Sequence, residues 1–403
     1  MAAIHGKNYG EPTLDLNFAG NKSLVDTTTQ KTYVTFSRAQ SGNEATYIGS
    51  DGLIKYAAAD EARFDHDPAT GESLGLLIEE ARTNFNPNSA ATYNGGANVT
   101  ANSALAPDGT FTAAALQPPA SSNPGGTHEL YAVFASVGTV NVGNTVTVYA
   151  RRNPGSAMKY LILRLFTSGW YNFYNLETGQ VVVNNPDMPG SMTSVGNGWW
   201  RCQLTNNTSA GATSSLRTFV STVPSIAPQT NGDPVYLWGV QNEAGSFPTS
   251  YIPTSASAVT RAADVADITG TDFSNFYNNT EGTWFTDMAL GYTQNAGNPF
   301  IFGGVHYTTV AGGAVRTLAN TPTIMGGLSN SQTIPSKTAV ALKSQDFAVY
   351  RDGTLTGSNN SLVYTPTGTQ WRINSSLGSL GRIKRVTYWP KRLPDIELQQ
   401  LTK

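Results

Sequence analysis

Acidic residues occur in two close pairs whose chemistry could be acid–base or metal binding. Asp65 and Asp67 flank His66, an alternation that places both carboxylates on one face of a strand. Carboxylate oxygens arranged in this way could bind a cation. The residues that follow favour a turn, because Asp67 precedes Pro68 and Gly71 closes the segment. We therefore expect a turn, with a cation site as the alternative.

The second pair, Glu79 and Glu80, is adjacent in the sequence. Neighbouring residues of a strand point to opposite faces, so both carboxylates cannot enter one site. We expect a solvated strand end or an interface contact with Arg82. Glycosidases need two carboxylates that face one cleft, and no motif such as E-x-D-x-x-E occurs here. We therefore predict no catalytic residue and expect that the chain is not an enzyme.

Aromatic side chains offer a different kind of binding chemistry. Residues 170–174 read WYNFY, which places rings on both faces of one strand. Exposed rings beside amide groups suit sugar recognition, because ring faces stack on C–H patches and amides bond hydroxyl groups. Trp170, Tyr171 and Tyr174 are therefore the candidate glycan contacts. The residue types favour the alternative, in which these rings pack in the core or at the rim of a sandwich.

The composition excludes several classes of protein. Charged residues make up 13% of the 403 residues and the net charge is −2, which argues against a nucleic-acid partner. The single cysteine, Cys202, excludes an intrachain disulfide and a Cys-based metal site. No run of about 18 apolar residues occurs, so we expect no membrane insertion. The first residues do not resemble a secretory signal. No cofactor is expected, although a structural calcium ion in a loop is an alternative.

Short runs rich in Val, Thr, Tyr, Phe and Trp alternate with Gly, Asn, Ser and Pro clusters through most of the chain. This texture predicts an all-β protein with two β-sandwich (jelly-roll) domains behind an irregular, turn-rich N-terminal segment. Asp352 and Gly353 predict a hairpin, and residues 393–401 predict a helix. We divide the chain into an N-terminal attachment and β segment, a middle jelly roll and a C-terminal sandwich, at 1–83, 84–260 and 261–403. Residues 14–18 (LDLNF) read as a strand that could join a sheet closed much later in the chain.

Three sets of motifs stand out along the chain. The first is FSRA (36–39), ATY (45–47), DGLI (51–54), ARFDHDP (62–68) and GLLIEEARTN (75–84). This block within residues 36–84 resembles the N-terminal part of head-spike or fibre proteins of tailed-phage virions. The second set is GWWR (198–201), YLWGVQNEAG (236–245), PTSYIPT (248–254) and VTRAAD (259–264), and with it the middle segment resembles a carbohydrate-binding-module-like jelly roll. The third set is GTWF (282–285), FAVYRDG (347–353) and GRIKRVTYWPKRL (381–393), and with it the last segment resembles a concanavalin-A-like (laminin-G-like) lectin sandwich.

The resemblance implies a non-enzymatic structural component of a virion: a head spike, a fibre or a capsid decoration protein assembled in the host cytoplasm. Its expected partners are other virion proteins, held through the N-terminal segment, with residues 1 to about 20 ordered only when docked. A homo-oligomer, guessed as a trimer, and a host-surface polysaccharide are further expected partners. The alternatives are a tail-associated adhesin that binds receptor or glycan and, third, a polysaccharide depolymerase.

Overall fold

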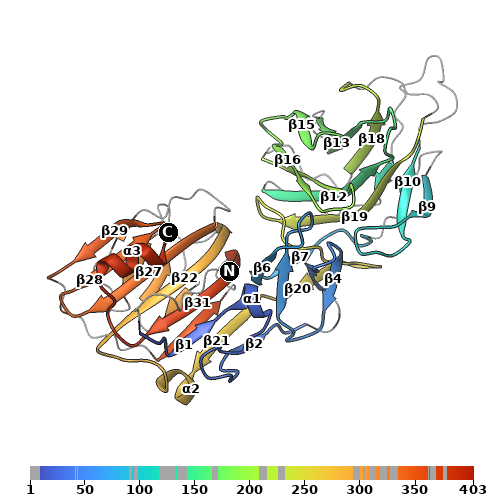
Figure 1. Cartoon of the computed structure of the whole chain (residues 1–403). Helices are drawn as coiled ribbons and strands as arrows, with labels where there is room; N and C mark the ends of the chain where they lie inside the picture. Colours follow the sequence, from blue (N-terminus) through green and yellow to red (C-terminus); the bar gives the residue numbers. More distant parts are fainter. Residues whose placement is uncertain are drawn as a thin grey trace.

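The computed structural model describes residues 10–40, 42, 44–89, 93–94, 99–117, 132–134, 143–165, 171–207, 216–225, 232–293, 300–302, 305–308, 314–317, 325–326, 335–361, 363, 369–374 and 379–403. Most of these residues lie in antiparallel strands, which confirms the all-β prediction. Figure 1 shows two β-rich lobes. Strands of the described residues before position 85, which we call the N-terminal block, lie between the lobes.

The first lobe is a sandwich whose strands come from both ends of the chain. Its larger sheet has the order β29-β28-β27-β22-β31-β6-β5, and β1 also pairs with β31. Its other sheet has the order β2-β21-β30-β23-β24-β25-β26. The strands are β1 (Leu14–Leu16), β2 (Thr35–Ser37), β5 (Arg63–His66), β6 (Ser73–Glu79), β21 (Val265–Thr269), β22 (Glu281–Thr293), β23 (Phe300–Phe302), β24 (Val305–Thr308), β25 (Ala314–Thr317), β26 (Met325–Gly326), β27 (Pro335–Lys343), β28 (Phe347–Arg351), β29 (Thr354–Asn359), β30 (Gln370–Asn374) and β31 (Ser379–Trp389). We call this lobe the composite sandwich.

The second lobe is the middle sandwich, and its strands are contiguous in the sequence. Its two sheets have the orders β16-β17-β12-β19-β10-β9 and β15-β14-β13-β18-β11-β8. The strands are β8 (Tyr93–Asn94), β9 (Val99–Ala104), β10 (Ala113–Leu116), β11 (Ala132–Phe134), β12 (Asn144–Arg152), β13 (Tyr160–Leu165), β14 (Asn172–Asn175), β15 (Gln180–Val183), β16 (Gly190–Ser194), β17 (Trp200–Thr205), β18 (Leu216–Ser221) and β19 (Val235–Ala244). Between the sheets lies a core of aliphatic side chains with Tyr174 and Cys202.

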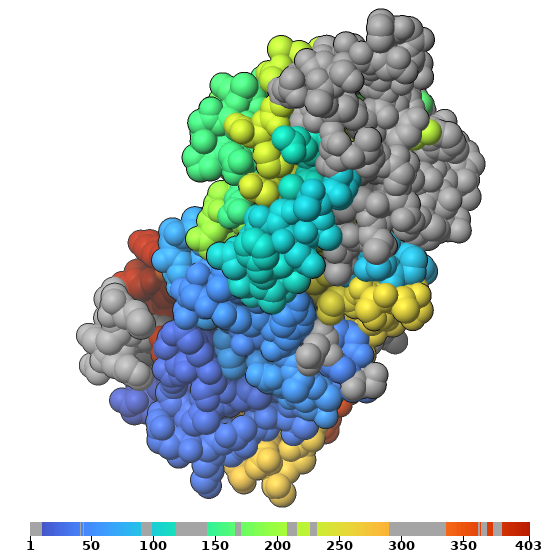
Figure 2. Space-filling view, turned by 90° about the vertical axis from the view of Figure 1, so that its right-hand side faces the viewer, coloured from blue at the N-terminus to red at the C-terminus, as the bar shows by residue number. Residues whose placement is uncertain are grey.

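Two further strand pairs lie where the lobes meet. One is a hairpin of β3 (Ala45–Ile48) and β4 (Ile54–Ala57), and the other joins β7 (Arg82–Asn84) to β20 (Val259–Arg261). The β7–β20 pair brings the two ends of the middle segment together. The middle sandwich is therefore an insertion between strands of the composite sandwich. In Figure 2 the N-terminal block, coloured blue, lies directly against the cyan part of the middle segment.

The N-terminal residues are part of the composite core from residue 14 onward. Leu14, Leu16 and Phe18 are fully buried, and β1 pairs in register with β31, Leu14 opposite Tyr388. This pairing confirms that LDLNF joins a sheet closed late in the chain. The expectation that residues up to about 20 are ordered only when docked is wrong for residues 14–20. Their apolar side chains are needed to complete the core, whereas residues 1–9 lie outside the described part.

The described residues contain three short helices: α1 (Phe18–Asn21), α2 (Gly270–Ser274) and α3 (Asp395–Leu401). Helix α3 confirms the helix predicted for the tail. It begins after Pro394, and Asp395 lies in its first turn, where the helix dipole favours a negative charge. The Asp352–Gly353 hairpin between β28 and β29 is also confirmed. Both residues have positive φ, 47° and 78°, as a tight hairpin turn requires.

Candidate functional site

A buried cluster of ion pairs lies where the two lobes meet, and Arg63 is at its centre. Its guanidinium is fully buried and contacts the Glu79 carboxylate at 2.7 Å and the Asp264 carboxylate at 2.5 Å. It also donates to the backbone oxygen of Thr46 at 2.8 Å and to the hydroxyl of Ser250 at 2.9 Å. A single side chain therefore connects the N-terminal block with segments on both sides of β20.

Two further buried arginines complete the cluster, which we call the ionic junction (Arg38, Arg63, Arg261, Glu79 and Asp264). Arg38 contacts the other oxygen of the Asp264 carboxylate at 3.0 Å, and Arg261 contacts Glu79 at 2.8 Å. The Asp264 carboxylate also accepts a hydrogen bond from the backbone N–H of Glu79 at 2.7 Å. The five residues come from β5, β6, β20 and the loops beside β2 and β21.

The pKa of Glu79 is shifted far below its ordinary value, although burial on its own would raise it. The nearby charges of Arg261 and Arg63 oppose burial, and Ser250 adds hydrogen bonds from its backbone N–H and its hydroxyl at 2.6 Å each. Burial of an ion pair is favourable only when such partners satisfy the charges. The Glu79 carboxylate therefore stays ionised at strongly acidic pH.

The structure corrects the expectation of a solvated strand end at Glu79 and Glu80. Both side chains are buried, because β7 and β20 cover the end of β6. The other expectation, an interface contact with Arg82, is confirmed for Glu80, which forms an ion pair with it. Burial raises the pKa of Glu80, with Arg82 opposing the shift. The two carboxylates have different partners, as opposite faces of one strand require.

Asp65 and Asp67 likewise have separate structural roles. The Asp67 carboxylate accepts from the backbone N–H groups of Ala69 and Thr70 at 2.9 Å each, which confirms the turn. The Asp65 carboxylate accepts from the backbone of Ile48 at 2.7 Å and from Arg382 at 2.6 Å. Within the described residues, no group of three or more His, Cys, Asp or Glu side chains could hold a metal ion.

The candidate glycan contacts Tyr171 and Tyr174 lie on opposite faces of one sheet. Tyr174 is fully buried in the middle core, and its hydroxyl donates to the backbone oxygen of Gln203 at 2.5 Å. Its assignment as a glycan contact is therefore corrected, because its ring faces inward from β14. Tyr171 is half-buried on the opposite face, beside Phe173 and Phe219, and its role remains a prediction. Trp170 lies outside the described residues.

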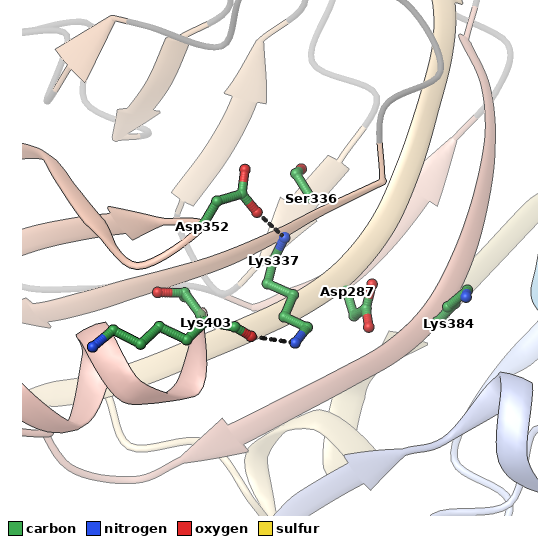
Figure 3. Close-up of a pocket in the computed structure, with 7 residues that line it drawn as sticks. Asp287, Ser336, Lys337, Asp352, Lys384 and Lys403 are labelled. Atoms are coloured by element: carbon green, nitrogen blue, oxygen red, sulfur yellow. Dashed lines mark hydrogen bonds between the residues drawn. The ribbon is translucent and has the colours of Figure 1, made fainter. Parts of the chain in front are cut away.

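A polar cavity of about 360 Å³ lies on the outer face of the composite sandwich, next to the end of α3 (Figure 3). Asp287 on β22 lies opposite Lys337 on β27 and contributes a half-buried carboxylate. Burial raises the pKa of Asp287, although Lys384 and Lys337 oppose the shift. Asp352 also lines the cavity, where its carboxylate accepts from the backbone N–H of Lys337 at 2.9 Å.

The cavity brings together two aspartates that the sequence analysis did not name as site residues, although it placed Asp352 in a hairpin turn. Asp287 and Asp352 are far apart in the sequence, and only strand pairing through β27 places them side by side. The ammonium groups are already engaged: Lys384 contacts Glu72 at 2.8 Å, and Lys337 donates to the backbone oxygen of Lys403. The cavity can offer hydrogen bonds to a small polar molecule, and no aromatic side chain is among the described residues that line it.

No model of a known protein family matches this sequence, and no curated protein does either. Among solved structures, the chain is similar to a Trypanosoma rangeli sialidase in complex with the inhibitor DANA, at 14% identity and a TM-score of 0.27 over 34% of this chain and 25% of that one. It is similar to the binding domain of botulinum neurotoxin DC in complex with SialylT, at 10% identity and a TM-score of 0.28 over 34% and 39%.

A third similar structure is the T. rangeli sialidase in complex with 2,3-difluorosialic acid, at 11% identity and a TM-score of 0.28 over 65% of this chain and 52% of that one. The chain thus spans between about a quarter and a half of the length of these three structures. Similarities this low carry no argument about activity or ligand. In the described part of the chain, no helix has the length and apolar character needed to cross a membrane.

Proposed function

We propose that this chain is a non-enzymatic structural component of a tailed-phage virion: a head spike, a fibre or a capsid decoration protein. The observation that carries the proposal is the ionic junction, together with the insertion of the middle sandwich into the composite one. A subunit that projects from a particle must hold its lobes in a fixed relation under shear. A buried junction in which each arginine contacts a carboxylate resists opening, because separation would leave an unpaired buried charge.

The sequence motifs support the same role. The motifs at 36–39, 62–68, 75–84 and 259–264 supply Arg38, Arg63, Glu79, Arg261 and Asp264, which are the five members of the junction. The block within residues 36–84 that resembles virion proteins thus supplies three of the five junction residues, and the motif at 259–264 supplies the other two. Low overall charge with abundant Asn, Ser, Thr and Gly gives a hydrated β surface suited to exposure on a particle.

The partners proposed with this role are other virion proteins. Because the composite core includes residues 14–18, attachment through the N-terminal segment is assigned to the residues before them. A homo-oligomer, with a trimer as the working guess, and assembly in the host cytoplasm complete the proposal. The single cysteine is buried and its pKa is raised by burial, so it is suited to neither disulfide formation nor catalysis.

Immunogold labelling of purified particles tests the proposal, with an antibody raised against this chain and particles from a deletion strain as the control. Label around the head supports a head spike or decoration protein. Label at the tail supports the adhesin alternative, in which receptor or glycan engagement is the main function. Particles that contain no copy of this chain, by labelling and by mass spectrometry, would overturn the virion role.

The depolymerase alternative has a separate test, because two aspartates line the cavity beside α3. Release of reducing ends from host capsular polysaccharide by the purified chain would support it, provided that Asp287→Asn abolishes the release. Release that persists in the variant would assign the activity elsewhere. A folded chain that releases nothing supports the non-enzymatic role.

A further inference from the structure

The outer face of the middle sandwich, which points away from its core, carries two half-buried arginines that the structural role leaves unexplained. They lie beside a buried hydrophobic cluster on the same face that includes Tyr149, Trp199 and, from β4, Ile54. On β12, Val146, Val148 and Ala150 point into the core, so Tyr149 and Arg151 point away from it. The strand register aligns Arg201 of β17 with Tyr149, and Arg151 with Tyr236 of β19. Figure 1 shows β12 and β19 side by side in this sheet.

Both guanidinium groups lie over aromatic rings. The Arg151 guanidinium carbon is 5.0 Å from the ring centroid of Trp199 and 5.2 Å from that of Tyr236. The Arg201 guanidinium carbon is 5.5 Å from the ring centroid of Tyr149. Rings at these distances attract a cation and fix the plane of the guanidinium. The two side chains are therefore held in place, whereas an arginine on an open surface moves freely.

Neither arginine forms an ion pair with a carboxylate in the part of the chain that the structure describes. One terminal nitrogen of Arg201 donates to the hydroxyl of Thr147 at 3.2 Å and the Nε is buried, which leaves the N–H groups of the other terminal nitrogen for a ligand. The neighbouring Arg152 differs, because it pairs with Glu177 at 2.7 Å. Burial lowers the pKa of Arg151 from its ordinary value, as expected for a cation without a counter-charge.

The two arginines lie on the same face of neighbouring strands. Arg201 is opposite Tyr149, and Arg151 lies two residues beyond Tyr149, so the two occupy diagonal positions. Each side chain is half-buried beside aromatic rings, and an anion bound at this face would supply the counter-charge that the described carboxylates do not. The planar guanidinium suits a carboxylate or sulfate group, because it can donate two parallel hydrogen bonds.

The surroundings of the arginines suit a sugar. Ser191 and Thr193 on the edge strand β16 are exposed, and the amide of Gln203 is half-buried beside them. The Ser191 hydroxyl donates to the side-chain oxygen of Gln203 at 3.1 Å, and the exposed hydroxyl of Thr193 can bond a sugar hydroxyl. Tyr236 serves this face by holding the Arg151 guanidinium over its ring. We propose that the face formed by Arg151, Arg201, Tyr236, Gln203 and Thr193 binds an acidic polysaccharide. The inference goes beyond the structural role and does not depend on it.

Affinity electrophoresis of the full chain tests the proposal, with polygalacturonate as the carboxylate polymer, heparin as the sulfated polymer and dextran as the neutral polymer. We expect retardation by polygalacturonate or heparin, weakened by added salt, and none by dextran. The response to the two acidic polymers identifies the anionic group. Equal retardation by all three polymers, or retardation by none, would overturn the proposal.

Variants locate the binding to this face. Arg151→Gln and Arg201→Gln should each weaken binding about 10-fold or more, since each removes charge-assisted hydrogen bonds. Arg152→Gln is the matched control, one residue away on the same strand, and should change binding less than about 2-fold. Arg151→Lys keeps the charge without the planar fork and should give an intermediate loss. Thermal melts confirm that each variant is folded. Unchanged binding in the folded double Gln variant would overturn the proposal.

Discussion

The arginines of the ionic junction and those of the outer face of the middle sandwich differ in their partners. Arg38, Arg63 and Arg261 each contact a buried carboxylate. Arg151 and Arg201 contact aromatic rings and have no carboxylate partner among the described residues. An arginine paired with a carboxylate stabilises the contact between distant segments. An arginine that packs on a ring without a carboxylate partner keeps N–H groups for a ligand. The same residue type thus indicates structure at one place and binding at the other.

The largest effect should come from Arg63→Ala. The variant removes a fully buried cation and leaves the Glu79 and Asp264 carboxylates without it. We expect a loss of about 3–5 kcal/mol in the free energy of unfolding, measured by urea denaturation. Lys55→Ala is the control, because its ion pair with Asp51 is exposed and contributes about 0–1 kcal/mol. Equal losses in the two variants would remove the distinction between the junction and the surface.

Glu79→Gln tests the charge of the junction through pH. The folded-state pKa of Glu79 lies below its ordinary value of 4.5, so ionised Glu79 stabilises the fold fully above that pH. The contribution is lost as the pH falls toward the folded-state pKa. We expect the stability gap between the parent and the variant to be largest near pH 7 and to shrink below about pH 4.5. A gap that is constant with pH would mean that packing, and not charge, holds the junction.

Asp15→Asn should have an intermediate effect, since Arg385, its partner, is a paired arginine whose side chain is 18% exposed. The Asp15 carboxylate accepts from Arg385 at 2.7 Å and 2.6 Å and from the hydroxyl of Thr387 at 2.9 Å. Burial opposes these partners, yet the pKa of Asp15 is lowered. We expect a loss of about 1.5–3 kcal/mol in denaturation experiments. We expect an ion pair to contribute less when its arginine is less buried. A loss as large as that of Arg63→Ala would contradict this expectation.

Arg151→Gln should change stability by less than about 1 kcal/mol, because no buried carboxylate loses its partner. Thermal melts of this variant and of Arg63→Ala at one pH give the comparison directly. If Arg151→Gln destabilises the chain as strongly as Arg63→Ala, the outer-face arginine is a packing residue. That outcome would break the comparison between the two sets.

The smallest effect, and the one with the opposite sign, is expected for Asp287→Asn. Burial raises the pKa of this carboxyl above its ordinary value of 3.8, so the ionised form costs stability at neutral pH. At pH 7 the variant should raise the melting temperature slightly, which corresponds to a gain of no more than about 0.5 kcal/mol in the free energy of unfolding. The gain should disappear as the pH falls below about 4, where both the folded and unfolded carboxyl are protonated. A lower melting temperature at pH 7 would show that the charge is stabilising.

Local patterns account for the parts of the fold that the sequence predicted. The Asp352–Gly353 hairpin follows from residues that tolerate positive φ, and α3 follows from Pro394 and the acidic first turn. The β texture follows from alternating apolar residues. The sequence predicted that β1 joins a sheet closed late in the chain but could not identify β31 as its partner, since the paired residues Asp15 and Thr387 lie 372 positions apart.

The candidate site was less predictable. Residues 170–174 carry rings on both faces, but only the assembled sandwich decides that Tyr174 faces the core. The recognised motifs contained all five residues of the ionic junction, three within residues 36–84 and two within 259–264, without indicating that they meet. The sequence did offer one signal of the junction, namely charged residues within strand-like runs. Such residues stand out because only 13% of the chain is charged.

The sequence by itself determined that this protein is built of β-strands, that it has no disulfide within the chain, and where its tight turn and its last helix lie. These features depend on residue types and on spacings of a few residues. Only the tertiary structure decided that Arg63 meets Asp264, 201 positions further along the chain, and that Arg151 has rings instead of a carboxylate beside it. The reason is physical: the partner of a charge is set by which strands pair and how they are covered, and those choices belong to the whole chain.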